Sequence, residues 1–367
     1  MSDFGTFYLP GPTEVRREVL EAMLQPMLPH RGAAFEALYA RCDAGLRGVF
    51  RTERPVLIAT ASATGLMEAS IRCAPAGAVL ALVNGAFSER YAQVAASCGR
   101  AVHRDDVAPG RVHCPADVRE ALARTGATVV TVAHSETSTG ALQDVRRLAE
   151  VAHEAGAVLL VDSVTGMAGA PCETDAWALD FVFTGSQKAL ALPPGLAFGV
   201  GSERFMAQAA TRPDRGTYFD LVEFEKFARK RQTPNTPAVS LLYALDAQVA
   251  AIGAEGIEAR WARHAAMQAA TDRWVGELAT TVDPGFAILA PAGARAPTVT
   301  CVLLPDGLRG SAVVDAVAAR GYVIGAGYGA LRDTTIRIGH MGDHTVSGVE
   351  RVLDVVREVI WALLAAR

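Results

Sequence analysis

The chain has 367 residues, 50% of them hydrophobic and 20% charged, with a net charge of −4. This composition is typical of a globular protein with a large core, and the length favours two domains. The sequence has no basic run, only 7% aromatic residues and no apolar stretch of about 18 residues. We therefore expect neither nucleic-acid binding nor a membrane span, and predict small molecules as partners.

The cysteine pattern argues against disulfide and zinc chemistry. None of the six cysteines forms a C-x-x-C pair, and no His–Cys cluster has zinc-ligand spacing. Residues 1–12 lack the basic start and apolar run of a signal peptide. We expect reduced, mostly buried thiols, no metal site and a cytoplasmic location.

In the first half of the chain, short apolar runs alternate with longer amphipathic segments. The apolar runs predict buried strands at 56–60, 78–83, 128–133, 158–162 and 181–184. The amphipathic segments predict helices at 65–73, 89–98, 115–124 and 144–155. This alternation indicates an α/β fold, in which a mostly parallel sheet is covered by helices on both faces.

The second half has a different pattern. Residues 200–240 are polar and turn-rich, and residues 233–237 (TPNTP) cannot continue a helix. Helices are then predicted at 238–252, 257–278, 310–320 and 346–365, and strands at 298–304, 322–324 and 335–338. We expect an N-terminal arm (1–20), a large domain (21–250) and a smaller α+β domain (251–367).

Lys188 stands in the segment TGSQKAL (184–190), directly after an apolar run. Ligand crevices of open α/β sheets lie at the carboxyl ends of the strands, where this lysine is predicted. Lysine amines form Schiff bases with carbonyl cofactors, and burial lowers the amine pKa. The alternative is an ordinary surface lysine in a loop.

Asp162 ends the apolar run 158–161, where a carboxylate needs a partner because burying it unpaired costs several kcal/mol. Pyridoxal-phosphate sites require an acid on the pyridine nitrogen. The next predicted strand leads to Lys188, so two neighbouring strands offer the acid and then the amine. A helix cap or a metal ligand is the alternative for Asp162.

Three further segments carry polar groups that suit such a site. The small-residue loop 60–65 (TASATG) precedes a predicted helix and could hold a phosphate on backbone N–H groups, or be an ordinary capped turn. Residues 134–140 (HSETSTG) follow a strand and offer hydroxyls for a cofactor ring, or form a plain turn. Arg337, between two isoleucines, fits a bidentate clamp on a carboxylate or an internal ion pair at a strand edge.

Together these segments resemble the class V, fold-type I pyridoxal-phosphate aminotransferases, in particular the alanine–glyoxylate and serine–glyoxylate (serine–pyruvate) branch. The similar motifs occur in the right order along nearly the whole chain. They are LPGPT (9–13), HSETSTG (134–140), VDSV (161–164), GSQKAL (185–190) with PPG (193–195), and RIG (337–339). The resemblance implies a central sheet of seven strands.

The resemblance also implies a role for each matching residue. Lys188 carries the cofactor as a Schiff base and moves the substrate proton, and Asp162 binds the pyridine nitrogen. Arg337 clamps the substrate α-carboxylate, and Gly11 lines the substrate entrance. The remaining contacts to the cofactor are expected from Ser62, Ala63, Thr64 and Gln187 (phosphate), Thr137 (ring hydroxyl), and Val164 and Phe87 (ring faces). Phe87 stands where close relatives often place a stacking tryptophan.

In the family the active site is shared between two subunits, so the resemblance implies a symmetric homodimer. Thr236 is then expected to reach the cofactor phosphate of the partner. A tyrosine is frequent where this chain has Thr233, which leaves the role of Thr233 open. His30 and Arg31 either lie near the substrate entrance or belong to a surface loop.

The expected reaction moves an amino group from alanine or serine to glyoxylate or pyruvate, in a ping-pong cycle through pyridoxamine phosphate. One alternative is 2-aminoethylphosphonate–pyruvate transamination, with Arg31 as a second cation. A cysteine desulfurase is a weaker alternative, because Gln187 stands where those enzymes have a histidine and Cys301 lies inside an apolar strand. Residues 325–329 (GAGYG) are a near miss to a dinucleotide-binding motif, with no helix predicted after them.

Overall fold

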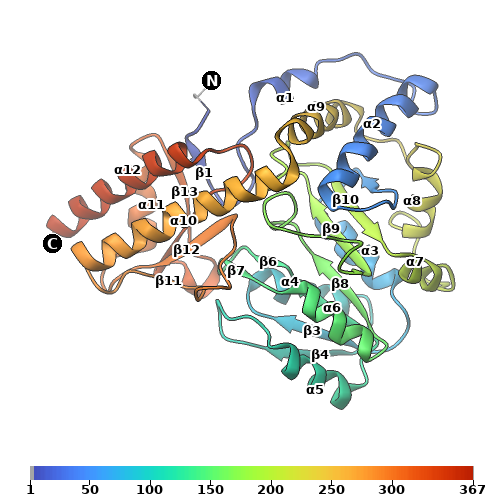
Figure 1. The fold of residues 1–367 in the computed structure, drawn as a ribbon, viewed down its shortest axis with the longest axis horizontal. Coiled ribbons are helices and arrows are strands. Elements are labelled where there is room, and N and C mark those ends of the chain that lie inside the picture. Colours follow the sequence, from blue (N-terminus) through green and yellow to red (C-terminus); the bar gives the residue numbers. More distant parts are fainter. Residues whose placement is uncertain (1–3, 367) are drawn as a thin grey trace.

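The computed structural model describes residues 4–366, which form one larger and one smaller β-sheet with helices around them (Figure 1). The larger sheet contains β2 (Leu57–Ala59), β3 (Val79–Val83), β4 (Val102–Asp106), β5 (Val129–Ala133), β8 (Val158–Asp162), β9 (Phe181–Gly185) and β10 (Ala197–Gly201). The smaller sheet contains β1 (Phe7–Tyr8), β11 (Ala287–Ile288), β12 (Val299–Leu303), β13 (Val323–Ala326) and β14 (Thr335–Gly339). A separate hairpin joins β6 (Ser135–Glu136) to β7 (Ala141–Leu142).

The strand order of the larger sheet is β2-β10-β9-β8-β5-β3-β4. The pairs β9–β8, β8–β5, β5–β3 and β3–β4 are parallel, whereas β10 runs antiparallel to both of its neighbours. The predicted seven-stranded, mostly parallel sheet is therefore confirmed. Because β8 and β9 are parallel neighbours, their carboxyl ends lie together at one edge of the sheet.

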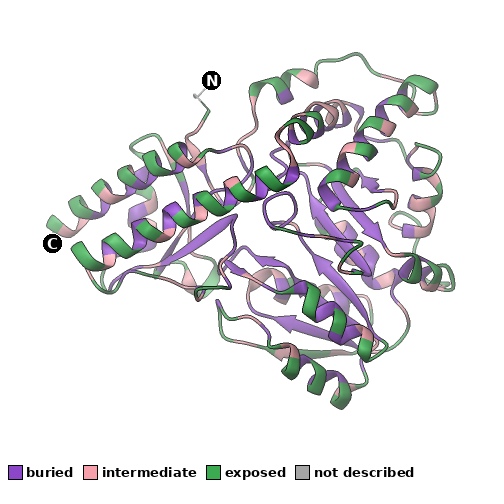
Figure 2. Cartoon of the chain, in the orientation of Figure 1, coloured by how far each residue is buried: buried purple, intermediate pink, exposed green. Residues whose placement is uncertain are grey.

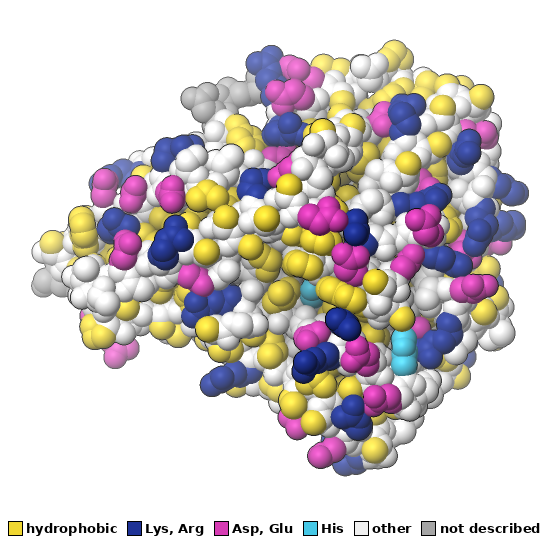
Figure 3. Space-filling view, in the orientation of Figure 1, with side chains coloured by type: hydrophobic (Ala, Val, Ile, Leu, Met, Phe, Trp, Pro, Cys, Tyr) yellow, Lys and Arg dark blue, Asp and Glu magenta, His cyan; other side chains and the backbone are white. Residues whose placement is uncertain are grey.

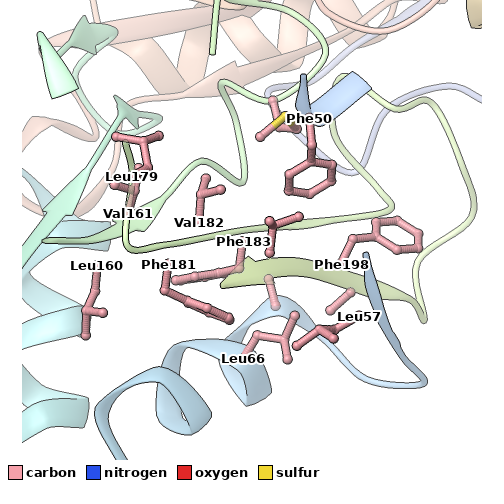
Figure 4. Packing of buried hydrophobic residues seen from close by; sticks show 14 of the residues in the cluster. Phe50, Leu57, Leu66, Leu160, Val161, Leu179, Phe181, Val182, Phe183 and Phe198 are labelled. Carbon is pink, nitrogen blue, oxygen red and sulfur yellow. The ribbon is translucent and has the colours of Figure 1, made fainter. Parts of the chain in front are cut away.

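The helices that precede residue 230 lie around the larger sheet. They are α1 (Arg17–Ala22), α2 (Ala33–Phe50), α3 (Ala63–Cys73), α4 (Ala86–Ser97), α5 (Pro115–Thr125), α6 (Val145–Glu154), α7 (Glu203–Ala210) and α8 (Leu221–Ala228). Phe181 and Phe183 of β9 alternate with Val182, so the two rings pack on the side of α3 and its Leu66 (Figure 4). Burial on both faces explains why the first three residues of β9, Phe181–Phe183, are all apolar.

The smaller sheet has its own hydrophobic core, which it shares with the long helices α10 (Ile257–Thr281) and α12 (Val346–Ala365) and with α11 (Gly310–Ala318). Helix α9 (Val239–Glu255) packs on the larger unit and leads directly into α10. Figure 2 shows that α10 and α12 bury one side and expose the other. The chain divisions at residues 20 and 250 remain predictions; strand β1, from within the predicted arm, pairs with β13.

The structure adds elements that the sequence pattern did not reveal. Strand β4 is polar and largely exposed at the edge of the sheet, so it lacks the apolar signal of a buried strand. Strand β10 and the helices α7 and α8 lie at or within the stretch read as turn-rich. Helices α3 and α4 each begin two or three residues before their predicted starts, which brings Ala63 and Phe87 into their first turns.

On the face drawn in Figure 3, basic and acidic side chains are interspersed among the described residues. None of the helices within residues 4–366 combines the length with the apolar composition of a transmembrane segment. Cys42, Cys73, Cys172 and Cys301 are buried thiols, Cys98 is half-buried and Cys114 is exposed, and all six are free.

Candidate active site

The carboxyl ends of β8 and β9 bring the two predicted catalytic residues together. Asp162 is the last residue of β8, and Lys188 follows the end of β9 by three residues. Both side chains are buried, with exposed fractions of 6% and 7%. The structure therefore places the acid and the amine at the ends of neighbouring strands, as predicted. Their catalytic roles stay predictions.

Burial shifts the pKa values of both groups toward neutrality. Burial, together with the positive charge of Arg337, lowers the pKa of Lys188 to about 8. It also raises the pKa of Asp162 to about 7, against a hydrogen bond from the backbone N–H of Val164 at 2.9 Å. A lysine with this pKa holds roughly a tenth of its amine unprotonated at pH 7, far more than an exposed lysine. The amine is therefore suited to attack a carbonyl group.

The N-terminal segment lies directly against Lys188. The Lys188 ammonium donates a hydrogen bond to the Pro10 carbonyl oxygen, and Thr13 Oγ1 donates to the Lys188 carbonyl oxygen at 3.1 Å. Gly11 has a φ of +102°, and a Cβ at this position would overlap the Lys188 side chain. A side chain at this position would be strained and would crowd the amine. The predicted place of Gly11 at the substrate entrance stays a prediction.

The predicted phosphate residues lie at the N-terminus of α3. Ser62 is the N-cap residue, and within the described chain its hydroxyl makes no capping hydrogen bond. Ser62 and Thr64 are exposed and Ala63 is buried. The side chain of Gln187 lies near this helix end. A Cβ built on Gly185 would lie 2.6 Å from Gln187 Oε1 and 3.4 Å from Ala63 Cβ, so both residues border Gly185. An N-terminus with uncapped N–H groups, hydroxyls and a neighbouring amide fits a phosphate group.

One aromatic ring lies near the amine, and a second ring contacts the first. The Phe87 ring, from the first turn of α4, has its centroid 5.9 Å from Lys188 Nζ. Tyr328, in the loop after β13, contacts it with a centroid separation of 5.8 Å. Phe87 comes from the larger unit and Tyr328 from the smaller one, so the contact joins the two. Tyr328 was not among the predicted site residues, because nothing in its local sequence distinguishes it from a solvent-exposed loop residue.

Thr137 and Val164 also lie in this region. Thr137 is 2% exposed, and its hydroxyl makes a short hydrogen bond with the hydroxyl of Thr165. Val164 is half-buried, and its carbonyl oxygen accepts a hydrogen bond from Thr184 Oγ1 at 3.2 Å. Neither contact tests the predicted approach of these residues to a cofactor ring.

Arg337, from β14, reaches the site from the smaller sheet. Its guanidinium donates to the carbonyl oxygens of Ala326 at 2.8 Å and Thr137 at 3.2 Å, and it lies over the Tyr328 ring at 5.7 Å. Within residues 4–366 no carboxylate forms an ion pair with it. The alternative interpretation of Arg337, an internal ion pair at a strand edge, is therefore wrong. A half-buried guanidinium held only by neutral groups is suited to bind an external carboxylate.

The segment 233–237 (TPNTP) lies beside the N-terminus of α3, where Ala238 N donates to Thr60 Oγ1 at 3.0 Å. Thr233 is buried and its hydroxyl donates to the Asn235 carbonyl oxygen within the same loop, whereas Thr236 is exposed. Arg31 donates to the carbonyl oxygens of Thr233 and Pro234, so it holds this loop. This engagement weakens the hypothesis that Arg31 binds a phosphonate. His30 is half-buried, and its role stays open.

The geometry gives little support to a cysteine desulfurase or to a dinucleotide-binding protein. Cys301 is buried in β12, and burial raises the pKa of its thiol to about 11, opposite to the requirement for a nucleophilic cysteine. Residues 325–329 lead from β13 into a short 3-10 turn (Gly329–Leu331) rather than into an α-helix. A dinucleotide-binding motif needs that helix for its phosphates.

Comparisons with known proteins cover almost the whole chain. The model of the family "Aminotransferase class-V" matches residues 10–352. An uncharacterized aminotransferase of Methanocaldococcus jannaschii is 34% identical over 361 residues, which make up 97% of this chain and 91% of that protein.

Solved structures give the same result. An aspartate aminotransferase of subgroup IV from Thermus thermophilus is 32% identical, with a TM-score of 0.88 over 97% of this chain and 99% of that one. The alanine–glyoxylate aminotransferase of a Nostoc species is 30% identical, with a TM-score of 0.90 over 98% and 96%. The two structures differ in the amino donor that their names state, so fold similarity alone does not select a donor.

Proposed function

The chain belongs to the class-V aminotransferase family, and we propose that it moves an amino group from a small amino acid, alanine or serine, to glyoxylate or pyruvate. The family uses pyridoxal phosphate, and the proposal includes this cofactor at Lys188. The observation that carries the proposal is the buried pair formed by Asp162 and Lys188 at the ends of two neighbouring parallel strands.

The residues present fit this cofactor at three points. Lys188 offers a buried amine of lowered pKa for its aldehyde, and Asp162 offers a carboxylate for its pyridine nitrogen. The N-terminus of α3, with Ser62, Ala63, Thr64 and the amide of Gln187 nearby, suits its phosphate. When bound, the cofactor supplies an electron-withdrawing ring and carries the nitrogen between the two half-reactions.

Each residue around the amine has a distinct role in the proposed reaction. Arg337 binds the substrate α-carboxylate and orients its Cα toward Lys188 Nζ, which takes and returns the proton on Cα. Phe87 covers one face of the cofactor ring, Val164 packs on the other, and Thr137 contacts the ring hydroxyl. Gly11 keeps space open beside the amine. Because Phe87 and Tyr328 contact each other over this space, the arrangement favours small side chains on the substrate.

We also propose that the active protein is a symmetric homodimer with a shared site, to which Thr236 of each subunit contributes a contact with the other subunit's cofactor phosphate. The exposure of Thr236, in a loop that Arg31 fixes beside the N-terminus of α3, supports this proposal. A cytoplasmic location remains a prediction that rests on the cysteine pattern.

The function is tested by substituting the lysine. Purified protein is expected to bind pyridoxal phosphate with a visible absorbance band, and the band should bleach when alanine or serine is added and return with glyoxylate or pyruvate. Lys188→Ala should lose the band and slow transamination at least about 1000-fold, because the amine is both the attachment point and the proton carrier. Transamination by Lys188→Ala at the wild-type rate would refute the assignment. A panel of amino donors, aspartate and 2-aminoethylphosphonate included, then identifies the substrate.

A further inference from the structure

Glu136 is a buried carboxylate beside the active site that the proposed reaction leaves without a role. It ends strand β6 and is 0% exposed. Among the described residues, no lysine, arginine or histidine forms an ion pair with it. A buried carboxylate without a cation is costly unless several hydrogen bonds stabilise its charge.

The hydrogen bonds of Glu136 come mainly from the first turn of α4. The backbone N–H of Phe87 is shared between its two oxygens at 3.2 and 3.3 Å, and the N–H of Ser88 donates to Oε2 at 3.0 Å. Ser138 donates to Oε1 through its N–H at 3.1 Å and its hydroxyl at 2.6 Å. The same Ser138 hydroxyl accepts the N–H of Ala86 at 3.0 Å. The free N–H groups of the helix end are thus satisfied by Glu136 and Ser138.

Gly85 lies directly against this carboxylate. A Cβ on Gly85 would overlap the Glu136 side chain and lie 2.5 Å from Ser138 Oγ, so the helix start and the carboxylate fit closely only because residue 85 is glycine. The backbone of Glu136 is fixed as well, because its carbonyl oxygen accepts the N–H groups of Thr139 at 3.2 Å and Gly140 at 2.8 Å. The carboxylate is therefore a rigid anchor for the first turn of α4.

We infer that Glu136 is a positioning residue, which fixes the Phe87 ring over the cofactor site by binding the backbone N–H of Phe87 itself. The inference rests on the proposed function, because it assigns to Phe87 the role of covering the cofactor ring. The neighbouring residue links the anchor to the substrate clamp, since the Thr137 carbonyl oxygen accepts a hydrogen bond from Arg337. One short segment therefore sets the position of the ring and of the guanidinium.

A double-mutant cycle on cofactor binding tests this inference. In Glu136→Gln an amide NH2 group must face backbone N–H donors in either orientation, so the first turn of α4 is expected to shift. The affinity of the apoprotein for pyridoxal phosphate, measured by titration of visible absorbance, should fall about 10- to 100-fold. Phe87→Ala should lower it as well. If Glu136 acts through the ring, Glu136→Gln should add less than about threefold in the Phe87→Ala background.

Two further variants control for general destabilisation. Glu89 lies in the same first turn of α4, but its carboxylate pairs with Arg104 at 2.5 Å, so Glu89→Gln should leave cofactor affinity within about twofold of the wild type. Ser138→Ala keeps the Glu136 carboxylate and removes one of its donors. Ser138→Ala should lower cofactor affinity less than Glu136→Gln does, and its effect should likewise be smaller in the Phe87→Ala background. It replaces Glu136→Gln as the test if that variant does not fold.

The outcomes are distinct from those that test the function. A wild-type protein that fails to bind pyridoxal phosphate overturns the proposed function. A wild-type protein that binds it, with losses from Glu136→Gln and Phe87→Ala that multiply fully, overturns the positioning role alone. Unchanged affinity in Glu136→Gln also overturns it. The visible spectrum and circular dichroism of the bound cofactor should shift in Glu136→Gln and not in Glu89→Gln.

Discussion

Arg337 is expected to affect both substrate binding and the pKa of Lys188, and substitutions can separate the two effects. Its guanidinium is proposed to bind the substrate carboxylate through two charge-assisted hydrogen bonds, each contributing about 1.5–3 kcal/mol. Arg337→Gln should therefore raise the free energy of the transition state by roughly 3 kcal/mol or more, which is about a 100-fold loss in kcat/KM. Cofactor affinity at high pH should change little, because no predicted cofactor contact involves Arg337.

The second property is the proton affinity of Lys188. Burial is the main cause of its lowered pKa, and the positive charge of Arg337 is the next. A nearby cation disfavours the protonated amine, so removing it raises the pKa of Lys188 from about 8 toward that of an exposed lysine. In Arg337→Gln, capture of pyridoxal phosphate by the apoprotein should therefore require a higher pH than in the wild type.

Arg337→Lys is the matched control because it keeps the charge and loses the planar fork. The pH at which the apoprotein captures the cofactor at half its maximal rate should stay near the wild-type value in Arg337→Lys and rise in Arg337→Gln. Both variants should lose kcat/KM. The reasoning is wrong if Arg337→Gln leaves that pH unchanged, or if kcat/KM falls less than about tenfold in both variants.

Two other predictions concern close packing and a buried ion pair. Gly11→Ala places a Cβ against Lys188 at a φ of +102°, so cofactor affinity should drop at least about tenfold in titrations of the apoprotein; unchanged affinity would contradict the crowding. Asp343 pairs with Arg260, whose side chain is 2% exposed, at 2.9 Å, and with Arg16 at 2.7 Å. Asp343→Asn should lower the urea unfolding free energy by about 3 kcal/mol at pH 7. Burial alone would raise the pKa of Asp343, but the two arginines hold it below its usual value. The difference in unfolding free energy between the wild type and Asp343→Asn should therefore shrink as pH falls below about 4. A difference that does not depend on pH would argue against the ion pair.

The residues whose place in the fold was predicted correctly share one property: each lies at, or a few residues after, the end of an apolar run. Asp162, Lys188 and Thr137 follow strands whose residues are buried on both faces, and such strands are visible as continuous apolar segments. The carboxyl ends of parallel strands meet at one edge, so the alternation of strands and helices already places these residues together. The family resemblance, now confirmed by matches over nearly the whole chain, then supplied the roles that spacing alone left open.

The residues that the sequence did not reveal act through contacts between distant segments. Tyr328 reaches Phe87 across 241 positions, and the Pro10 carbonyl oxygen meets Lys188 across 178. Glu136 was noted only as part of a polar segment, because its donors lie on a helix about 50 positions earlier in the chain. Hydrophobic periodicity reports which face of an element is buried. It carries no information about which backbone group a buried carboxylate binds.

The candidate site is built across the junction of the two units, and the proposed binding of substrate depends on that junction. Asp162 and Lys188 lie at strand ends of the larger sheet, whereas Arg337, the proposed carboxylate clamp, lies in β14 of the smaller sheet, and Tyr328 follows β13. Arg337 bonds to Thr137, and Arg260 of α10 bonds to the carbonyl oxygen of Ala189, next to Lys188, so hydrogen bonds cross the junction close to the reacting atoms. The distance between clamp and amine is therefore set by how the units pack, and not by either sheet alone. A change in this packing would move Arg337 relative to Lys188 while both sheets stay intact, which is one way in which proteins of the same fold can differ in substrate.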